Sequence, residues 1–254
     1  MATKFKNILI TGASSGIGEA LAIYFAAHKA ENIFICGRNA ERLETVSEKC
    51  NKLGANVYSR IIDVTDIQAL KLWIEEAEKI SPLNLVIANA GVATLEETSE
   101  NVYKTFNTNI FGVLNTIQPA LNLFQKRNDK QPRTIAIMSS IAGYHGLAAC
   151  PSYSASKACV KAYGEALRAS LLSSGIQISI ICPGFVKSRI TDKNTCPMPF
   201  FMSAEKAAKI IATRLERNIG LIAFPWQMRL ASWAVSILPN WISTHIYAKL
   251  PHKV

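Results

Sequence analysis

The sequence predicts an α/β fold in which helices cover a parallel β-sheet. Short, β-rich apolar runs alternate along the chain with longer helical patterns, as expected for successive strand–helix units. Runs such as Ile176 to Ile181 are too apolar for a strand with one wet face, which indicates burial on both faces. No internal repeat or low-complexity linker divides the chain, so a single domain over 1–254 is the economical organisation.

The elements follow from the periodicity of the apolar residues and from the signals at their ends. Asn39 and Ser203 precede helical patterns as candidate N-caps, and Thr65 with Gln68 resembles a capping box. Strands are expected at 6–11, 32–36, 56–62, 84–88, 133–139, 176–182 and 220–224, and helices at 17–29, 40–52, 66–80, 100–126, 153–173 and 204–217.

Length and composition indicate a globular protein with a large core. The chain has 254 residues, of which 49% are hydrophobic. No run reaches the roughly 18 consecutive apolar residues that a membrane span needs. Residues 1–6 lead directly into an apolar strand, without the longer apolar stretch and cleavage site of a secretory signal. We therefore expect a cytoplasmic protein.

The cysteines are expected to remain thiols. They are spread over a chain without a secretion signal and form no C-x-x-C pair, and no metal site is expected. Cys150 is the most notable, because it precedes Tyr153 by three residues. The set comprises Cys36, Cys50, Cys150, Cys159, Cys182 and Cys196.

The chain is basic, with a net charge of +10 and a pI near 9.4. Such a balance suits nucleic acid, an anionic membrane or a phosphorylated small ligand. The basic residues are scattered, however, with no arginine-rich run, zinc-ligand spacing or aromatic RNA motif. These absences argue against a nucleic-acid partner.

A glycine-rich loop joins the first strand to the first helix. The segment Thr11-Gly12-Ala13-Ser14-Ser15-Gly16-Ile17-Gly18 has the spacing G-x-x-x-G-x-G. Glycines allow a tight turn and a close approach to a pyrophosphate, whose charge is favoured at a helix N-terminus. A purely structural glycine turn is the alternative, but the strand before and the helix after favour a dinucleotide site.

The end of the second strand indicates which dinucleotide is bound. NAD sites usually place a carboxylate here for the ribose hydroxyls. In this chain Gly37 occupies that position and Arg38 follows it. A guanidinium binds a phosphate dianion, which a carboxylate would repel. The sequence thus favours NADP(H) over NAD(H), unless Arg38 is only a solvated turn residue.

Tyr153 and Lys157 carry the sharpest chemical signal. Four residues apart on a predicted helix, they project from one face. A phenol with a pKa near 10 is a poor acid or base at neutral pH unless a nearby cation stabilises its anion. Ser140, at the end of a strand, could hold a substrate oxygen beside the phenol. Asn109 is polar within an apolar stretch and needs a buried partner or water.

In this combination and order, the motifs resemble the short-chain dehydrogenase/reductase family, in its compact soluble branch. The resemblance runs from about residue 6 to about residue 217. It implies a single Rossmann-type, doubly wound domain with a seven-stranded parallel sheet. It also implies that Tyr153 is the catalytic acid/base, that Ser140 orients the carbonyl and that Asn109 anchors a proton-relay water. Lys157 would lower the pKa of the phenol and bind the nicotinamide ribose.

The resemblance implies further cofactor contacts. Asp63 resembles the residue at the adenine ring, and Asn89 the asparagine that stabilises the sheet. Three departures from the family pattern are Ala88 in place of Asn, Ser188 in place of Thr, and Ser15 where many NADP-binding members have Lys or Arg. The full set of expected cofactor residues is Gly12, Ser14, Ser15, Gly16, Ile17, Gly18, Arg38, Asp63, Val64, Asn89, Ala90, Gly91, Tyr153, Lys157, Pro183, Gly184, Val186 and Ser188.

The substrate side is expected in the loop 187–202 and in the C-terminal segment, where the family varies. Met and Phe residues within 197–202 indicate an apolar substrate wall or a lid packed on the protein's own core. The substrate contacts expected elsewhere are Ser140, Ala142, Tyr144, His145, Cys150 and Phe185, with Leu147 on the same wall.

The C-terminal extension 225–254 contains no Asp or Glu and three of the four tryptophans. Its apolar part is interrupted by Arg229, Ser232 and Ser236. Tryptophan and basic residues anchor peripheral proteins in a membrane interface, so 226–250 could contact a membrane. The segment could equally close the substrate pocket or pack on another subunit.

We expect an NADP(H)-dependent oxidoreductase that interconverts a carbonyl and an alcohol. The substrate remains open among steroid, retinoid, acyl-thioester, sugar and quinone carbonyls, with apolar ones favoured. The alternatives are an NADP(H)-binding regulatory protein and a membrane-surface scaffold. The resemblance also implies a homodimer or homotetramer formed by the long helices.

Overall fold

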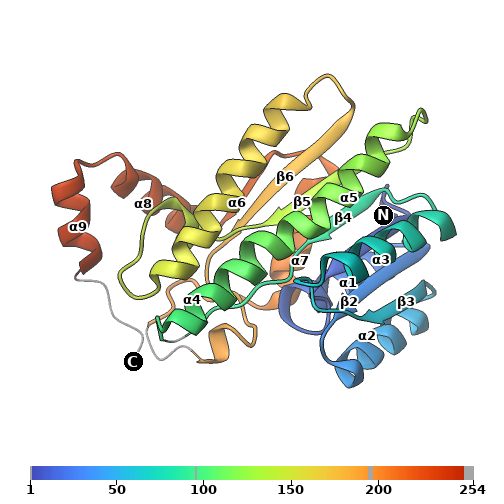
Figure 1. The fold of residues 1–254 in the computed structure, drawn as a ribbon, viewed down its shortest axis with the longest axis horizontal. Coiled ribbons are helices and arrows are strands. Elements are labelled where there is room, and N and C mark those ends of the chain that lie inside the picture. The colour runs from blue at the N-terminus through green and yellow to red at the C-terminus, as the bar shows by residue number, and fades with distance from the viewer. Residues whose placement is uncertain (1, 95, 194–196, 249–254) are drawn as a thin grey trace.

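A computed structural model of the protein describes residues 2–94, 96–193 and 197–248 (Figure 1). Within these ranges, seven strands form one sheet in the order β3-β2-β1-β4-β5-β6-β7, and all neighbouring strands are parallel. The prediction of a seven-stranded parallel sheet is confirmed. The strands are β1 (Asn7–Thr11), β2 (Asn32–Gly37), β3 (Asn56–Ile61), β4 (Leu85–Ala88), β5 (Arg133–Met138), β6 (Ile176–Pro183) and β7 (Leu221–Phe224).

Helices connect the strands and extend the chain beyond the last of them. The α-helices are α1 (Gly16–Ala27), α2 (Ala40–Lys52), α3 (Ile67–Ile80), α4 (Ser99–Phe106), α5 (Gly112–Lys126), α6 (Pro151–Ser170), α7 (Ala204–Glu216), α8 (Trp226–Ser236) and α9 (Asn240–Ala248). The shorter elements are the π-helix η1 (Asn107–Phe111) and the 3₁₀-helices η2 (Ile141–Tyr144) and η3 (Thr191–Lys193).

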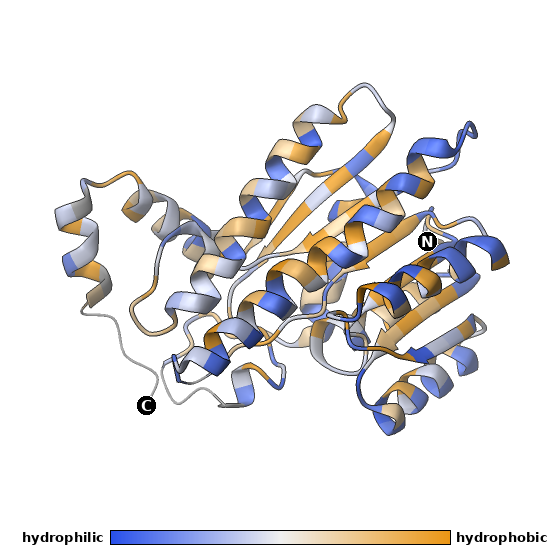
Figure 2. Ribbon diagram, viewed as in Figure 1, coloured by the Kyte–Doolittle hydropathy of each residue, from blue (hydrophilic) through white to orange (hydrophobic). Residues whose placement is uncertain are grey.

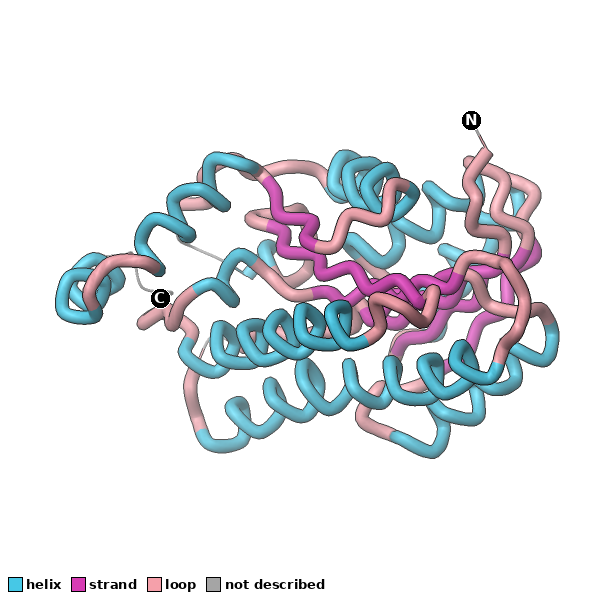
Figure 3. Tube along the Cα trace, turned by 90° about the horizontal axis from the view of Figure 1, so that it is seen from above, coloured by secondary structure: helices cyan, strands magenta, loops and turns pink. Residues whose placement is uncertain are grey.

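Helices cover both faces of the sheet, as the tube in Figure 3 shows. Successive strand residues point to opposite faces, so Ile8 and Ile10 join a core with α1, α2 and α7. Leu9, between them, joins the second core with α3, α5 and α6. The strands are accordingly hydrophobic while the helices carry polar residues outward (Figure 2). Because each face of the sheet borders a hydrophobic core, successive residues of the inner strands are mostly apolar.

Two of the three predicted helix caps are found in the structure. Asn39 accepts a hydrogen bond from the backbone N–H of Arg42, and Ser203 accepts one from that of Lys206. The predicted capping box at Thr65 is wrong. Asp66 is the N-cap of α3, because its carboxylate accepts the N–H groups of the first turn. The Thr65 hydroxyl donates instead to Asp63, at 2.9 Å.

The expected continuous helix over 100–126 is helical throughout but contains a π-helical turn. The five residues 107–111 form η1, which joins α4 directly to α5. Such turns insert an extra residue and re-aim the side chains around them. Asn109 lies within this turn and is fully buried.

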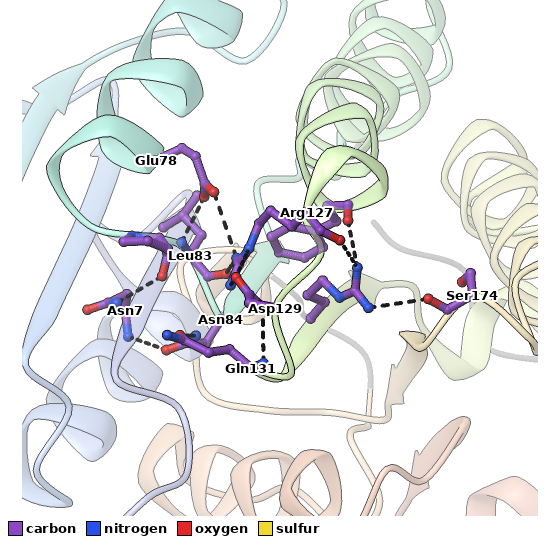
Figure 4. Close-up of polar contacts among 11 residues, drawn as sticks. Asn7, Glu78, Leu83, Asn84, Arg127, Asp129, Gln131 and Ser174 are labelled. Carbon is purple, nitrogen blue, oxygen red and sulfur yellow. Dashed lines mark hydrogen bonds and ion pairs between the residues drawn. The ribbon is translucent and has the colours of Figure 1, made fainter.

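Polar side chains tie together the amino ends of the central strands (Figure 4). The Asn84 side chain accepts the backbone N–H groups of Lys6 and Asn7, each at 3.0 Å, and donates to Gln131 at 2.9 Å. Arg127 donates to the carbonyl of Leu83 at 2.6 Å. These bonds satisfy backbone groups that neither strand nor helix pairing uses. They lie at the opposite ends of the strands from the cavity described next.

Candidate active site

The order of the strands opens a crevice between β1 and β4. The chain leaves β1 toward β2 on one side and leaves β4 toward β5 on the other, so the two connections diverge. In doubly wound sheets, ligands bind at the carboxyl ends of the strands beside such a switch point. A cavity of about 370 Å³ lies there. Its lining includes every expected cofactor residue except Gly18.

The glycine loop brings bare backbone to the floor of this cavity. Gly12 and Gly16 have φ of 67° and 60°, a region that favours glycine. A Cβ on Gly12 would lie 2.7 Å from the Cα of Ala90. Gly18 has a different task, because a Cβ there would lie 2.5 Å from the side-chain nitrogen of Asn89. Gly18 thus permits close packing of α1 behind the cavity.

Asn89 holds the glycine loop to the end of β4. Its side-chain nitrogen donates to the carbonyls of Thr11 and Gly12, at 3.0 and 3.1 Å. Its backbone N–H donates to the Thr11 hydroxyl at 3.1 Å. The N-cap residue of α1, Ser15, makes no side-chain cap bond. The N–H groups of the first helical turn are therefore left for an anion at the cavity.

Charged side chains gather where β2 and β3 end. The Arg38 guanidinium lies 3.4 Å from the Asp63 carboxylate, and both line the cavity. Burial opposes ionisation of Asp63, but hydrogen bonds from Thr65 and the charge of Arg38 leave its pKa below the usual value. Arg42 also lines this end, and its buried Nε has no hydrogen-bond partner among the described residues. An unpaired guanidinium nitrogen at a cavity suits an anionic ligand.

Ser140, Tyr153 and Lys157 meet at the other end of the cavity. Ser140 follows β5 as the N-cap of η2, and the other two residues project from α6. A hydrogen bond links the hydroxyls of Ser140 and Tyr153. Lys157 Nζ lies 5.7 Å from the centre of the Tyr153 ring and donates to the carbonyl of Met138 at 3.0 Å. Strand and helix thus bring the three predicted catalytic side chains together.

Burial has the largest effect on the pKa values of Tyr153 and Lys157. It raises the pKa of Tyr153 to about 12, although the hydrogen bond from Ser140 opposes the rise. Burial also lowers the pKa of Lys157 to about 8. The sequence led us to expect a phenol made acidic by the ammonium, whereas burial keeps the pKa of Tyr153 above its ordinary value, and the ammonium donates to the Met138 carbonyl.

Asn109 is buried behind the cavity and does not line it. Its side-chain oxygen accepts the N–H of Val92 at 2.8 Å. Its nitrogen donates to the Val92 carbonyl at 2.9 Å and to the Ser156 hydroxyl at 3.0 Å. The side-chain amide therefore ties η1 to the loop after β4 and to α6. Its expected part in a proton relay remains a prediction.

Residues 6–197 match the family model described as short chain dehydrogenase. The chain belongs to this family. The match ends within the loop after β6, short of the extent expected from the sequence motifs. The glycine loop and the cluster around Tyr153 both lie inside it. Members of the family use a nicotinamide cofactor and act on small molecules, so this dehydrogenase is an oxidoreductase.

Individual relatives agree with the family assignment. An uncharacterized oxidoreductase of Myxococcus xanthus is 33% identical over 241 residues, covering 93% of this chain and 94% of that protein. A 3-dehydrosphinganine reductase of Arabidopsis thaliana is 34% identical over 185 residues, or 71% of this chain and 56% of its own. A short chain dehydrogenase from Mycobacterium paratuberculosis, solved bound to NAD, has the same fold, with a TM-score of 0.73 at 21% identity over 85% of this chain and 94% of its own.

The expected substrate residues other than Ser140 lie outside the lining of the dehydrogenase's cavity. Tyr144 is half-buried, its ring packed on the second core and 5.0 Å from Lys161 Nζ. Cys150 is buried as the N-cap of α6. Ala142 donates its N–H to Ser140, while His145 and Phe185 are partly exposed. Instead, the cavity lining adds Ile62, Val92, Ala93, Thr108, Met138, Ser139, Arg189, Ile190 and Thr191.

The first part of the loop expected to contact the substrate folds back on itself beside the cavity. The Thr191 hydroxyl accepts the N–H of Ser188 at 2.8 Å and donates to the carbonyl of Val186 at 2.9 Å. The rings of Phe200 and Phe201 are 53% and 47% exposed, so they do not form a lid packed on the protein's own core. The five cysteines among the described residues form no disulfide. Cys196 lies outside the described residues.

Glu97 caps the helix that carries Tyr153 and Lys157, a role that sequence reasoning missed. Its carboxylate accepts the backbone N–H of Ser152 at 3.1 Å and the Ser152 hydroxyl at 2.8 Å. Ser152 directly precedes Tyr153 and is 3% exposed. A carboxylate at a helix N-terminus satisfies unpaired N–H groups and complements the helix dipole. Glu97 therefore positions the start of α6, the helix that carries Tyr153 and Lys157.

Replacing Glu97 by alanine should lower the free energy of unfolding by about 1 kcal/mol, the usual cost of losing a cap. It should also lower kcat several-fold, because the first turn of α6 orients the phenol. Chemical denaturation and steady-state kinetics measure the two effects. Glu96→Ala, one residue earlier on the same loop, is the matched control. Equal effects of the two substitutions would show that the cap does not position Tyr153.

Proposed function

We propose that this dehydrogenase is an NADP(H)-dependent oxidoreductase that interconverts a carbonyl and an alcohol on an apolar substrate. The observation that carries the proposal is the arrangement of one elongated cavity. A serine–tyrosine–lysine cluster lies at one end, and the guanidinium groups of Arg38 and Arg42 lie at the other. The guanidinium groups suit the phosphate of a phosphorylated dinucleotide. The acid/base at the other end suits the oxygen of a substrate.

The residues present fit such a dinucleotide. The glycine loop offers a backbone cradle that a Cβ on Gly12 would fill, and α1 offers an N-terminus without a side-chain cap. Gly37 leaves no carboxylate where NAD sites usually have one. Arg42 lines the same end of the cavity, and its guanidinium would take the place of the basic residue absent at Ser15. Arg38 and Arg42 would hold the additional phosphate.

The catalytic cycle follows from the chemistry of the cluster. When bound, the nicotinamide supplies or accepts the hydride. In reduction, the hydroxyls of Ser140 and Tyr153 hold the substrate oxygen, and Tyr153 donates its proton as negative charge develops there. Lys157, as a buried cation, stabilises the phenolate that remains. Reprotonation of Tyr153 from solvent then restores the enzyme.

The substrate is proposed to be an apolar ketone or aldehyde. The exposed Phe200 and Phe201 rings and the apolar residues that follow β6 offer surface for it. Among the relatives, one is named for the reduction of 3-dehydrosphinganine. Oxidation of NADPH by the purified protein against a panel of ketones and aldehydes tests the proposal. A panel that gives no turnover with NADPH or NADH would contradict it.

Substituting Arg38 by alanine should raise the KM for NADPH by about 10- to 100-fold, since a charge-assisted hydrogen bond contributes about 1.5–3 kcal/mol. The KM for NADH should change by less than a factor of about two, because NADH lacks the phosphate. Arg60→Ala removes an exposed arginine paired with Glu76 at 2.8 Å and serves as the control. Parallel changes in both KM values would contradict a phosphate role for Arg38.

A further inference from the structure

Helix α8 exposes a stripe of large apolar side chains. Trp226, Leu230, Trp233 and Ile237 follow one another at spacings of four, three and four residues, so they share one face. Their exposed fractions are 67%, 52%, 52% and 63%. A helix at the surface of a soluble protein normally turns such a face inward. This face, which we call the α8 stripe, is instead open to solvent.

The opposite face fixes the direction in which the stripe points. Met228 packs on the second core, and its sulfur would lie 2.8 Å from a Cβ placed on Gly184. Gly184 lines the cavity, and α8 also packs against η2, which begins directly after Ser140. Helix α8 is therefore held against the end of the cavity that contains Tyr153, with its stripe facing away from the protein. Together with α9 it lies at one end of the molecule, on the left in Figure 1.

The segment that carries the stripe has charge of one sign. From Arg217 to the C-terminus the sequence contains no Asp or Glu, and the whole chain carries a net charge of +10. The exposed Arg229 flanks the stripe, and Trp241 of α9 is 71% exposed. Tryptophan rings favour the headgroup region of a bilayer, and basic residues favour anionic lipids. The composition therefore matches an anionic membrane surface.

A second copy of the chain is the competing occupant of the stripe. A two-fold interface would bring the same basic segment against itself, with no carboxylate within it to offset the repulsion. Within the described residues, no helix is long and apolar enough to cross a bilayer. A contact with lipid is accordingly peripheral, with α8 lying in the plane of the headgroups.

We propose that the α8 stripe docks this enzyme on anionic lipid bilayers. Because the buried face of α8 borders the Tyr153 end of the cavity, docking brings that end of the cavity near the lipid. The substrate would then be an apolar carbonyl compound that resides in the bilayer. This second part rests on the proposed function, whereas docking itself does not.

Tryptophan fluorescence can test docking directly. Of the four tryptophans, only Trp73 lies outside α8 and α9, and it is 3% exposed. In a Trp73→Phe variant, all emission comes from Trp226, Trp233 and Trp241. Vesicles of phosphatidylcholine with phosphatidylserine should shift this emission to the blue and sediment the protein, and pure phosphatidylcholine should do so far less. Protein that stays in the supernatant with both vesicles would overturn the proposal.

A pair of double variants identifies the surface. Leu230→Gln with Ile237→Gln should weaken binding to the anionic vesicles at least tenfold. The control is Ile61→Gln with Leu172→Gln, because these side chains are 66% and 82% exposed elsewhere on the molecule. Equal loss in both double variants would overturn the assignment to α8. So would a smaller oligomer for the α8 variant, measured by sedimentation, with vesicle binding unchanged.

Activity separates the two parts of the proposal. With NADPH and a water-soluble ketone, the α8 double variant should keep wild-type kcat. With an apolar ketone carried in anionic vesicles, its turnover should fall in step with its vesicle binding. Equal turnover of that ketone by the wild type and the variant would overturn delivery from the bilayer. Vesicle binding without turnover of any carbonyl compound would instead contradict the proposed function, while membrane docking would still be supported.

Discussion

Replacement of Tyr153 by phenylalanine is expected to lower kcat by about 10³- to 10⁴-fold, the upper range for loss of a general acid. The substitution removes only the hydroxyl that is bonded to Ser140 and retains the ring beside Lys157. Binding of NADPH, measured by fluorescence titration, should change by less than about twofold, because most of the proposed cofactor contacts lie on the glycine loop and the ends of β2 and β4.

The same helix provides a matched control. Tyr163 lies on α6, ten residues after Tyr153, and its hydroxyl accepts a hydrogen bond from Gln118 at 2.6 Å at the surface. Tyr163→Phe should leave kcat within about twofold of the wild type. If Tyr153→Phe retained appreciable turnover, the proton would come from another group, and the assignment of the acid would be wrong.

Replacement of Lys157 by methionine is expected to lower kcat by about 10²- to 10³-fold. Methionine fills similar volume but leaves the phenolate without a cation. In the wild type, the lowered pKa of about 8 means that reduction should slow as the pH rises above this value and Lys157 loses its charge. The variant should lack this step in its pH profile. Lys161→Met, on the same helix and paired with Glu165 at 2.8 Å, is the control.

Stability gives a second readout for Lys157 that does not depend on turnover. A lysine with a pKa of about 8 in the folded protein and 10.5 as its ordinary value disfavours folding while it is charged. This cost begins to fall as the pH rises through 8 and is gone only above 10.5. Between pH 7 and 9.5, the unfolding free energy of the wild type should rise by about 2 kcal/mol relative to Lys157→Met. A constant difference between the two proteins would show that burial does not lower this pKa.

Local signals in the sequence were sufficient for most of the fold. The apolar runs gave the seven strands because both faces of the sheet are covered, and Asn39 caps α2 through a contact three residues away. The cap of α3 was misplaced because Thr65 and Asp66 are adjacent candidates. Which of the two caps the helix depends on Asp63, because its carboxylate accepts a hydrogen bond from the Thr65 hydroxyl. The π-turn around Asn109 has no periodic signature.

In the site, too, local motifs predicted some residues, while others depend on contacts distant in the sequence. Residues in the glycine loop and the Tyr153 motif line one cavity, because each motif fixes its own backbone at a strand or helix end. The expected substrate wall stays a prediction, and its residues beyond Ser140 do not line this cavity, with Tyr144 packed against the second core. Arg42 could have been found from its place in the first turn of a helix that starts at the cavity. Glu97 could not, since it meets Ser152 across 55 positions of sequence.

The polar hydrogen bonds around Asn84 and Arg127 hold the sheet together at the end away from the segments that we propose select the substrate. They join β1, β4 and the segment before β5 at the end of the sheet remote from Tyr153 (Figure 4). The described parts of the loop after β6, residues 187–193 and 197–202, lie at the other end and share none of these bonds. Loops from other family members could therefore be grafted there to retarget the enzyme at little cost to its folding.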